Sequence, residues 1–222
     1  MSDVYAPSPA PTHRLIPSRF PPIGLFDTVA TAADLEAVME LAGWTNDRLV
    51  AQRLARLPRA EWVHGTPNAS IVMASFLHVT PGGMRFNGPA LGAWYAAATM
   101  PAAVAEVAHH LRREAVARGV DTARRRYRTY VADLAGDYLD IRGQKTVRPD
   151  VYAPASYAAG QALGETVRAG GGAGLIYDSL RYAGGVNIAA LRPRNITGVV
   201  QAAHYAITVR AGERRIDVQV LP

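Results

Sequence analysis

Four residues that lie far apart in the sequence have side chains that could together bind a dinucleotide and cleave it. Arg85 follows two glycines in the segment 82–88, Tyr95 lies ten residues later, and Glu106 lies eleven residues after that. Ser179 belongs to a second motif, Gly-Leu-Ile-Tyr-Asp-Ser-Leu-Arg. An arginine can hold a phosphate in bidentate fashion, an aromatic ring can stack on a flat base, and a carboxylate favours the cation that forms when a glycosidic bond breaks. These side-chain types predict a pocket for glycosidic cleavage of a dinucleotide.

Each of these residues also has a purely structural interpretation. Glu106 could be a solvent-facing helix residue paired with Arg113 or His110, and Arg85 could be a surface arginine that caps a turn. Ser179 has no adjacent base in the sequence, and the Gly-x-Ser-x-Gly elbow of hydrolases is missing. We therefore interpret Ser179 as a polar contact to a ribose or to Glu106, and not as a nucleophile.

The neighbours Trp94 and Tyr95 lie in a predicted strand, so their side chains point to opposite faces of a sheet. One of the two rings therefore belongs to the core, and we expect Tyr95 to be the ring that stacks on the ligand. Asn87, Arg181 and Asn187 are weaker candidates for the rim of the same pocket.

A metal site is a further possibility, because Glu106 and His109 are spaced to share a helix face, with His110 beside them. The required second cluster is missing: the chain has six histidines and no His-Glu-x-x-His motif. We therefore expect no metal. The absence of cysteine excludes disulfides, thiolate nucleophiles and Cys-ligated zinc.

The composition is that of one globular domain. The 222 residues are 49% hydrophobic and 19% charged, which indicates a packed core and not a disordered chain. No apolar run approaches 18 residues and no signal peptide precedes the first motifs, so we expect a cytoplasmic protein that does not enter a membrane. The net charge of +6 is carried by arginine, because Lys145 is the only lysine.

Hydrophobic periodicity and turn residues predict an α+β fold: a single compact domain with a central mixed, mostly antiparallel sheet flanked by helices and an N-terminal helical cap. We expect a flexible N-terminus over 1–12, a helical extension over 13–65 and a catalytic core over 66–222. Thr31 and Asp34 resemble a capping box, and Thr99 with Pro101 marks another helix start. The predicted helices cover 31–43, 46–57, 99 onward and 156–167, and the predicted strands cover 71–79, 91–97, 125–134, 175–180, 185–191, 199–209 and 216–221.

The order of these motifs resembles the RES domain family. The matching pieces are the Gly-Gly-x-Arg-Phe-Asn turn at 82–87, the strand with Tyr95, a helix that opens with residues 105–109, and the Tyr-x-Ser-x-Arg strand. The run 13–22 also resembles longer members of that family. Asp178 departs from the pattern, since many relatives have proline there.

The resemblance implies an ADP-ribosyltransferase-like fold and a bacterial toxin that is held inactive by an Xre-type antitoxin. It implies that Glu106, Arg85, Tyr95 and Ser179 act on NAD, and that ADP-ribose passes to a host protein such as phosphoribosyl pyrophosphate synthetase. Hydrolysis or phosphorolysis of NAD is the alternative. NAD is then a substrate, and the partners are the antitoxin, in a hetero-oligomer, and the acceptor protein.

An alternative of another class is a basic, non-catalytic protein that binds nucleic acid. Its arginines would have to gather on one face with aromatic residues between them. The run 124–128, Arg-Arg-Arg-Tyr-Arg, is the only such cluster, and alternation along a strand would divide it between two faces. We therefore expect no direct binding of nucleic acid by this chain.

Overall fold

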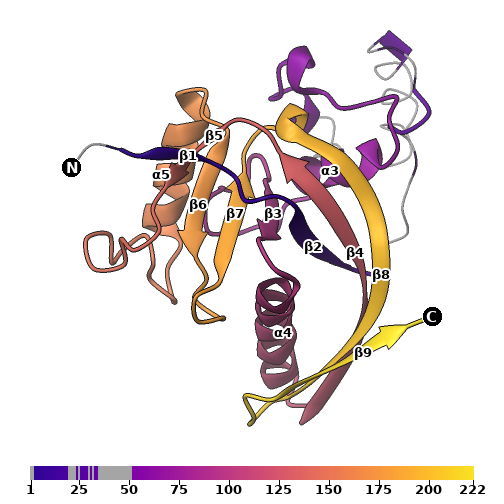
Figure 1. Ribbon diagram of the computed structural model, residues 1–222, viewed down its shortest axis with the longest axis vertical. Coiled ribbons are helices and arrows are strands. Elements are labelled where there is room, and N and C mark those ends of the chain that lie inside the picture. The colour runs from indigo at the N-terminus through magenta and orange to yellow at the C-terminus, as the bar shows by residue number, and fades with distance from the viewer. Residues whose placement is uncertain (1–2, 20–23, 25, 30, 32, 35–51) are drawn as a thin grey trace.

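The computed structural model describes residues 3–19, 24, 26–29, 31, 33, 34 and 52–222. In this part of the chain, nine strands form one sheet in the order β1-β5-β6-β7-β3-β2-β4-β8-β9 (Figure 1). The strands are β1 Tyr5–Pro7, β2 Thr12–Pro17, β3 Trp94–Ala97, β4 Thr122–Leu134, β5 Asp137–Asp140, β6 Gly174–Asp178, β7 Val186–Ala190, β8 Ile196–Arg210 and β9 Ile216–Leu221. Among these strands only the β5–β6 pair is parallel, which confirms the predicted α+β class with a mixed, mostly antiparallel sheet.

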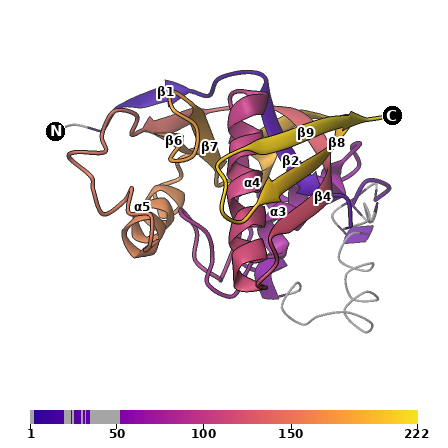
Figure 2. The same ribbon diagram turned by 90° about the horizontal axis from the view of Figure 1, so that it is seen from below.

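Helices cover both faces of this sheet. The α-helices of the described residues are α3 Ala69–Leu77, α4 Met100–Ala117 and α5 Ala158–Ala169, with short 3-10 helices η1 Arg59–Glu61 and η2 Pro193–Asn195. On β7, Ile188 packs in the cluster that contains α3, whereas its neighbour Ala189 packs in the cluster that contains Val167 of α5. Because successive side chains of a strand point to opposite faces, α3 lies on one face and α5 on the other. Helix α5 packs against β6, whereas α4 lies farther along the sheet, against β2, β3, β4, β7 and β8 (Figure 2).

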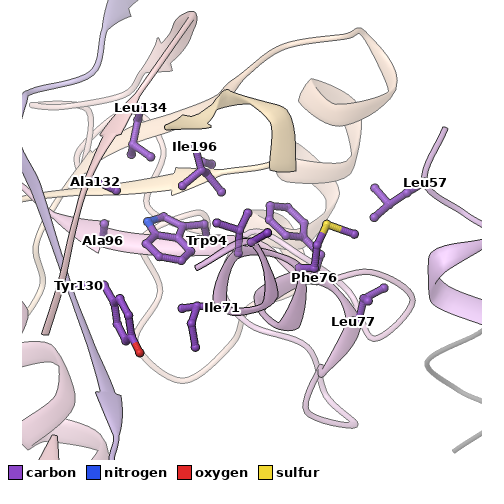
Figure 3. Close-up of a cluster of buried hydrophobic side chains, with 14 of the residues drawn as sticks. Leu57, Ile71, Phe76, Leu77, Trp94, Ala96, Tyr130, Ala132, Leu134 and Ile196 are labelled. Carbon is purple, nitrogen blue, oxygen red and sulfur yellow. The ribbon is translucent and has the colours of Figure 1, made fainter. Parts of the chain in front are cut away.

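Helix α3 corrects the predicted strand over 71–79. The β-branched and aromatic residues of this stretch favour a strand by propensity, but residues on nearly every side of the helix are buried, including Met73 and Phe76 at 0% exposure. An apolar run that is buried all round has no helical periodicity from which it could be recognised. Figure 3 shows the helix packed against Trp94 and Tyr130 of the sheet.

The N-terminal segment is part of the sheet, which corrects two predicted boundaries. Residues 5–7 form β1 and pair with β5, so the predicted flexible segment over 1–12 is ordered there. Residues 13–17, predicted to begin a helical extension, lie in β2 between β3 and β4. Pro11 precedes this short strand and Pro17 is its last residue, and both obscured it, because prolines are typical of turns.

The predicted N-terminal helices over 31–43 and 46–57 lie largely outside the described residues. The predicted cap is present where it can be seen: the Asp34 amide donates to Thr31 Oγ1 at 3.1 Å, and that hydroxyl donates to Asp34 Oδ2 at 2.7 Å. In the described part of the chain, we find no helix whose length and apolarity would let it cross a membrane.

Helix α4 begins where the sequence predicted. Thr99 is its N-cap and accepts from the Ala102 amide at 3.4 Å, and Pro101 lies in the first turn. The helix packs Ala108 and Leu111 against the sheet. The cap therefore sets the start of the helix that carries Glu106.

We expect Thr99→Ala to lower the free energy of unfolding by about 1 kcal/mol, because the Ala102 amide loses its acceptor at the helix start. Chemical denaturation of the variant and the parent measures this difference. Thr99→Ser, which keeps the hydroxyl, is the control. Equal stability of the alanine variant and the parent would show that the cap does not stabilise α4.

Candidate active site

Glu106 lies in the second turn of α4, and side chains from two strand ends hold its carboxylate. Ser179 Oγ, directly after β6, and Asn187 Nδ2, on β7, each donate to Glu106 Oε1 at 2.7 Å. Ser179 and Asn187 are buried, so water competes little for these bonds. Both bonds from the described residues end on Oε1, so Oε2 is the oxygen that can face a ligand.

The Ser179 hydroxyl uses its full hydrogen-bonding capacity. Besides donating to Glu106, it accepts from the amides of Arg181 and Tyr182, each at 3.1 Å. A hydroxyl has one proton to donate and two lone pairs, so neither lone pair is left to attack a substrate. This geometry agrees with the interpretation of Ser179 as a polar contact to Glu106.

The segment 82–88 forms a tight turn on the same face of the sheet. Gly83 adopts φ of +69°, and the Met84 amide donates to the Asn87 carbonyl at 2.9 Å. The left-handed conformation at Gly83 is the one that glycine adopts at least cost. The turn thereby places Arg85 and Phe86 at its tip.

Tyr95, on β3 of the sheet, holds this turn through its hydroxyl group. Its hydroxyl accepts from the Phe86 amide and donates to Asn87 Oδ1, both at 2.9 Å. Burial raises the pKa of Tyr95 above its ordinary value, so the phenol stays protonated and keeps its donor role. The neighbouring Trp94 is fully buried on the other face, as the alternation predicted. Asn87 is also fully buried, and so braces the turn instead of lying on a rim.

Arg85 is buried and already engaged. Its Nη1 donates to the carbonyls of Val151 at 2.9 Å and Ala153 at 3.0 Å, and its guanidinium lies 4.8 Å from the centre of the Tyr157 ring. These bonds tie the turn to the loop after β5. Both of these bonds come from Nη1, so the planar fork retains Nε and Nη2 as donors.

Helix α5 contacts the backbone of the turn through two glycines that lie one helical turn apart. A Cβ on Gly160 would lie 3.3 Å from Arg85 Cγ and would also meet the Arg85 carbonyl, and one on Gly164 would lie 2.7 Å from the Phe86 carbonyl carbon. Between them, Gln161 Nε2 donates to the carbonyls of Gly82 and Met84. The helix can therefore hold the turn only because these two positions lack side chains.

Tyr177 lies between the hydrogen-bonded Glu106 group and the Arg85 turn. It lies on β6 directly opposite Asn187 of β7, and its ring contacts Phe86 edge to face at 4.8 Å between centroids. Burial raises the pKa of Tyr177 well above its ordinary value, the Glu106 carboxylate adds to the rise, and Arg85 opposes it. Tyr177 is therefore close enough to Glu106 and Arg85 to interact with both charges.

Arg181 and Asp178 lie at the edge of this arrangement. The Arg181 amide binds Ser179, and burial, followed by the positive charge of Arg181, lowers the pKa of His109 to about 4. Asp178 Oδ2 accepts from the Gly143 amide at 2.8 Å and from the Tyr152 hydroxyl at 3.3 Å. The departure from proline at 178 thus gives the end of β6 a hydrogen-bonded contact with the 141–152 loop.

The structure therefore assembles the predicted residues into two groups. Glu106, Ser179 and Asn187 are directly hydrogen-bonded, and Asn87 and Tyr95 form a second group with the Arg85 turn. Sequence reasoning missed Tyr177, Gly160, Gln161 and Gly164. The Gly-x-x-x-Gly spacing at 160–164 was the available signal for a close helix contact, and Tyr177 was visible in the motif around Ser179 without an assigned role.

Comparison with known proteins identifies the family. The model of the RES domain matches residues 53–210, and the chain belongs to the RES domain family. An uncharacterized protein y4oC of Sinorhizobium fredii (strain NBRC 101917 / NGR234) is 36% identical over 78 residues, which cover 33% of this chain and 32% of that protein. The chain thus matches about a third of that relative's length.

A solved structure is also similar. A chain in the crystal structure of the M. tuberculosis MbcT-MbcA toxin-antitoxin complex is 18% identical, and the superposition covers 55% of this chain and 73% of that chain with a TM-score of 0.41.

We expect Gly164→Ala to destabilise the protein by about 1–3 kcal/mol, because the new methyl group overlaps the Phe86 backbone. The better helix propensity of alanine, about 1 kcal/mol, offsets part of this loss. The measurement is the free energy of unfolding in urea. Gly82→Ala is the matched control, since a Cβ there meets nothing within 4 Å. A Gly164→Ala variant more stable than the parent would show that α5 does not touch the turn.

Proposed function

We propose that this protein is the cytoplasmic toxin of a toxin–antitoxin pair, and that it cleaves NAD and transfers ADP-ribose to a host protein. The observation that carries the proposal is the Glu106 carboxylate, held by Ser179 and Asn187 near the buried Tyr177. Membership of the RES domain family supports it.

In the proposed reaction, the bond between C1′ of the ribose and the nicotinamide nitrogen breaks. Nicotinamide leaves with the electron pair, which creates a cation on the ribose, and an acceptor then bonds to C1′ and loses a proton. A carboxylate about 4 Å from that cation is worth roughly 4 kcal/mol at an effective dielectric constant near 20, about a thousandfold in rate. Glu106 Oε2 is the group that we assign to this role.

The other candidate residues bind the substrate or position Glu106. Arg85 contacts the pyrophosphate through Nε and Nη2, and Tyr95 or Tyr177 stacks on the nicotinamide. Asn187 Oδ1 is buried and has no hydrogen-bond partner among the described residues, so a hydroxyl or amide donor of the substrate would satisfy it. Ser179 positions Glu106, and Arg181 lies at the entrance.

The sheet does not favour the nucleic-acid alternative. Along β4, Arg125 pairs with Glu114 of α4 at 2.8 Å, and Tyr127 is buried beneath the same helix. Arg124 and Arg126 therefore point to the opposite face. The basic run is divided, as its alternation predicted.

We expect Glu106→Gln to fold like the parent, because a glutamine oxygen can still accept from Ser179 and Asn187, and to lose about a thousandfold in nicotinamide release. The assay is nicotinamide release from NAD, with thermal unfolding as the check on folding. Glu114→Gln removes the same charge from the same helix and should keep the parental rate. Undiminished release by Glu106→Gln would overturn the assignment.

The acceptor of ADP-ribose is identified by incubating the protein and NAD with host extract and analysing the products by mass spectrometry. ADP-ribose attached to protein supports transfer. Free ADP-ribose alone would indicate hydrolysis, and ADP-ribose 1″-phosphate alone would indicate phosphorolysis, and either result would replace the proposed transfer.

An enzyme that drains or uses NAD in its own host must be inhibited, and we propose an Xre-type antitoxin as the inhibitor. We expect an acidic or carboxylate-terminated segment of the antitoxin to occupy the phosphate positions near Arg85 and Arg181. Such charge pairs weaken with salt, since the Debye length is about 8 Å at physiological ionic strength.

NAD affinity should therefore be lower for the complex with the antitoxin than for the toxin alone. Calorimetry at low and high salt measures both affinities. Equal affinities would mean that the antitoxin blocks the acceptor surface and leaves the NAD pocket open.

A further inference from the structure

The exposed side of α4 continues beyond the proposed catalytic carboxylate. Glu106, His109, Arg113 and Ala117 follow each other at intervals of three or four residues, so they share one stripe of the helix surface that runs to its last residue. Arg113 lies about 10 Å along the axis from Glu106, at 1.5 Å per residue. A ligand lying along this stripe would reach both positions.

The far end of the stripe is hollowed. A depression of about 410 Å³ is lined by His109, Arg112, Arg113, Val116, Ala117 and Ala211. Ala211 belongs to the turn between β8 and β9, which lies beside the end of α4 in Figures 1 and 2. The hollow is thus formed between helix and hairpin, close to the site but separate from the Arg85 turn.

The charge of this surface is positive. None of the side chains that line the hollow is acidic. Arg112 is committed to the hairpin, because its Nε and Nη2 donate to the carbonyls of Arg210, Arg214 and Arg215 at 3.1–3.3 Å. Arg113 is exposed, so its guanidinium is available to a partner. His109 is neutral at pH 7, because its pKa is lowered to about 4, so the arginines supply the charge.

The same surface has an apolar part. Val116, in the last turn of α4, is 61% exposed, and Val120, which follows the helix, is 43% exposed. Exposed valines beside the available guanidinium of Arg113 suit a protein partner better than a small anion, since a small anion would use only the charge. Charge complementarity selects a partner with acidic residues next to apolar ones.

We propose that the end of α4, from His109 to Ala117 with the adjoining hollow and Val120, docks an acidic segment of the protein that accepts ADP-ribose. The inference rests on the proposed transfer to protein and adds the chemical class of its substrate. An acceptor whose acidic and apolar residues bind Arg113 and Val116 would place a side chain about 10 Å away, at Glu106. Water needs no such contact, so hydrolysis of NAD does not depend on the stripe.

The test uses Arg113→Glu, which reverses one charge of the stripe and leaves Arg112 and the hairpin intact. Arg126→Glu is the matched control, because Arg126 is exposed on the opposite face of β4. Two rates are measured for each protein: nicotinamide release in buffer alone, and transfer of label from biotinylated NAD to proteins of a host extract.

We expect Arg113→Glu to release nicotinamide at the parental rate and to label protein about tenfold more slowly, because like charges then face each other. At saturating NAD, added salt should slow labelling by the parent more than it slows nicotinamide release. Arg126→Glu should match the parent in both assays.

Equal labelling by Arg113→Glu and the parent would overturn the docking site while leaving the transferase intact. A parallel loss of nicotinamide release in buffer would assign the hollow to NAD binding and would overturn it as well. Nicotinamide release without any protein labelling by the parent itself would overturn the proposed transfer and, with it, the acceptor site.

Discussion

The proposed site depends on a single carboxylate oxygen, which connects α4 to the ends of two strands. Glu106 Oε1 accepts from Ser179, which is 73 residues later, and from Asn187, which is 81 residues later. A hydrogen bond to a charged group contributes about 1.5–3 kcal/mol, so the pair holds α4 against the ends of β6 and β7. A change in the start of α4 or in the β6–β7 register would separate these groups, and the Thr99 cap and the antiparallel pairing prevent both.

The two faces of the sheet differ in what they pack against: one is covered by an apolar core, and the other carries the candidate site. On the first face, α3 fills the core with side chains around Trp94 and Phe76. On the second, α4 and α5 pack at different places. Tyr95 and Tyr177 belong to the cluster around α5, and Asn187 of the intervening strand β7 binds Glu106 of α4. Polar groups there are satisfied largely by one another, which is how a buried polar cluster remains stable while keeping its donors aligned.

Two forms of rigidity position the proposed substrate contacts. Gly160 and Gly164 let α5 touch the backbone of the Arg85 turn, and Tyr95 holds that turn from the sheet. The burial that keeps both tyrosines protonated also strengthens the field of the Glu106 carboxylate. The exposed stripe of α4 extends from this rigid site toward solvent, so substrate cleavage and partner docking would share one helix.

The sequence alone determined much of the local structure and the set of candidate residues. Turn chemistry at 82–88, the cap at Thr99 and strand alternation depend on neighbouring residues, so they could be predicted, as could the division of Trp94 and Tyr95 between two faces. The motif order also identified the family. The helical state of α3, the central place of β2 and the contact of α5 glycines with the Arg85 turn were decided by tertiary packing. Burial on all sides removes periodicity, and contacts between residues far apart in the sequence, such as Gly164 with Phe86, leave no local pattern from which they could be inferred.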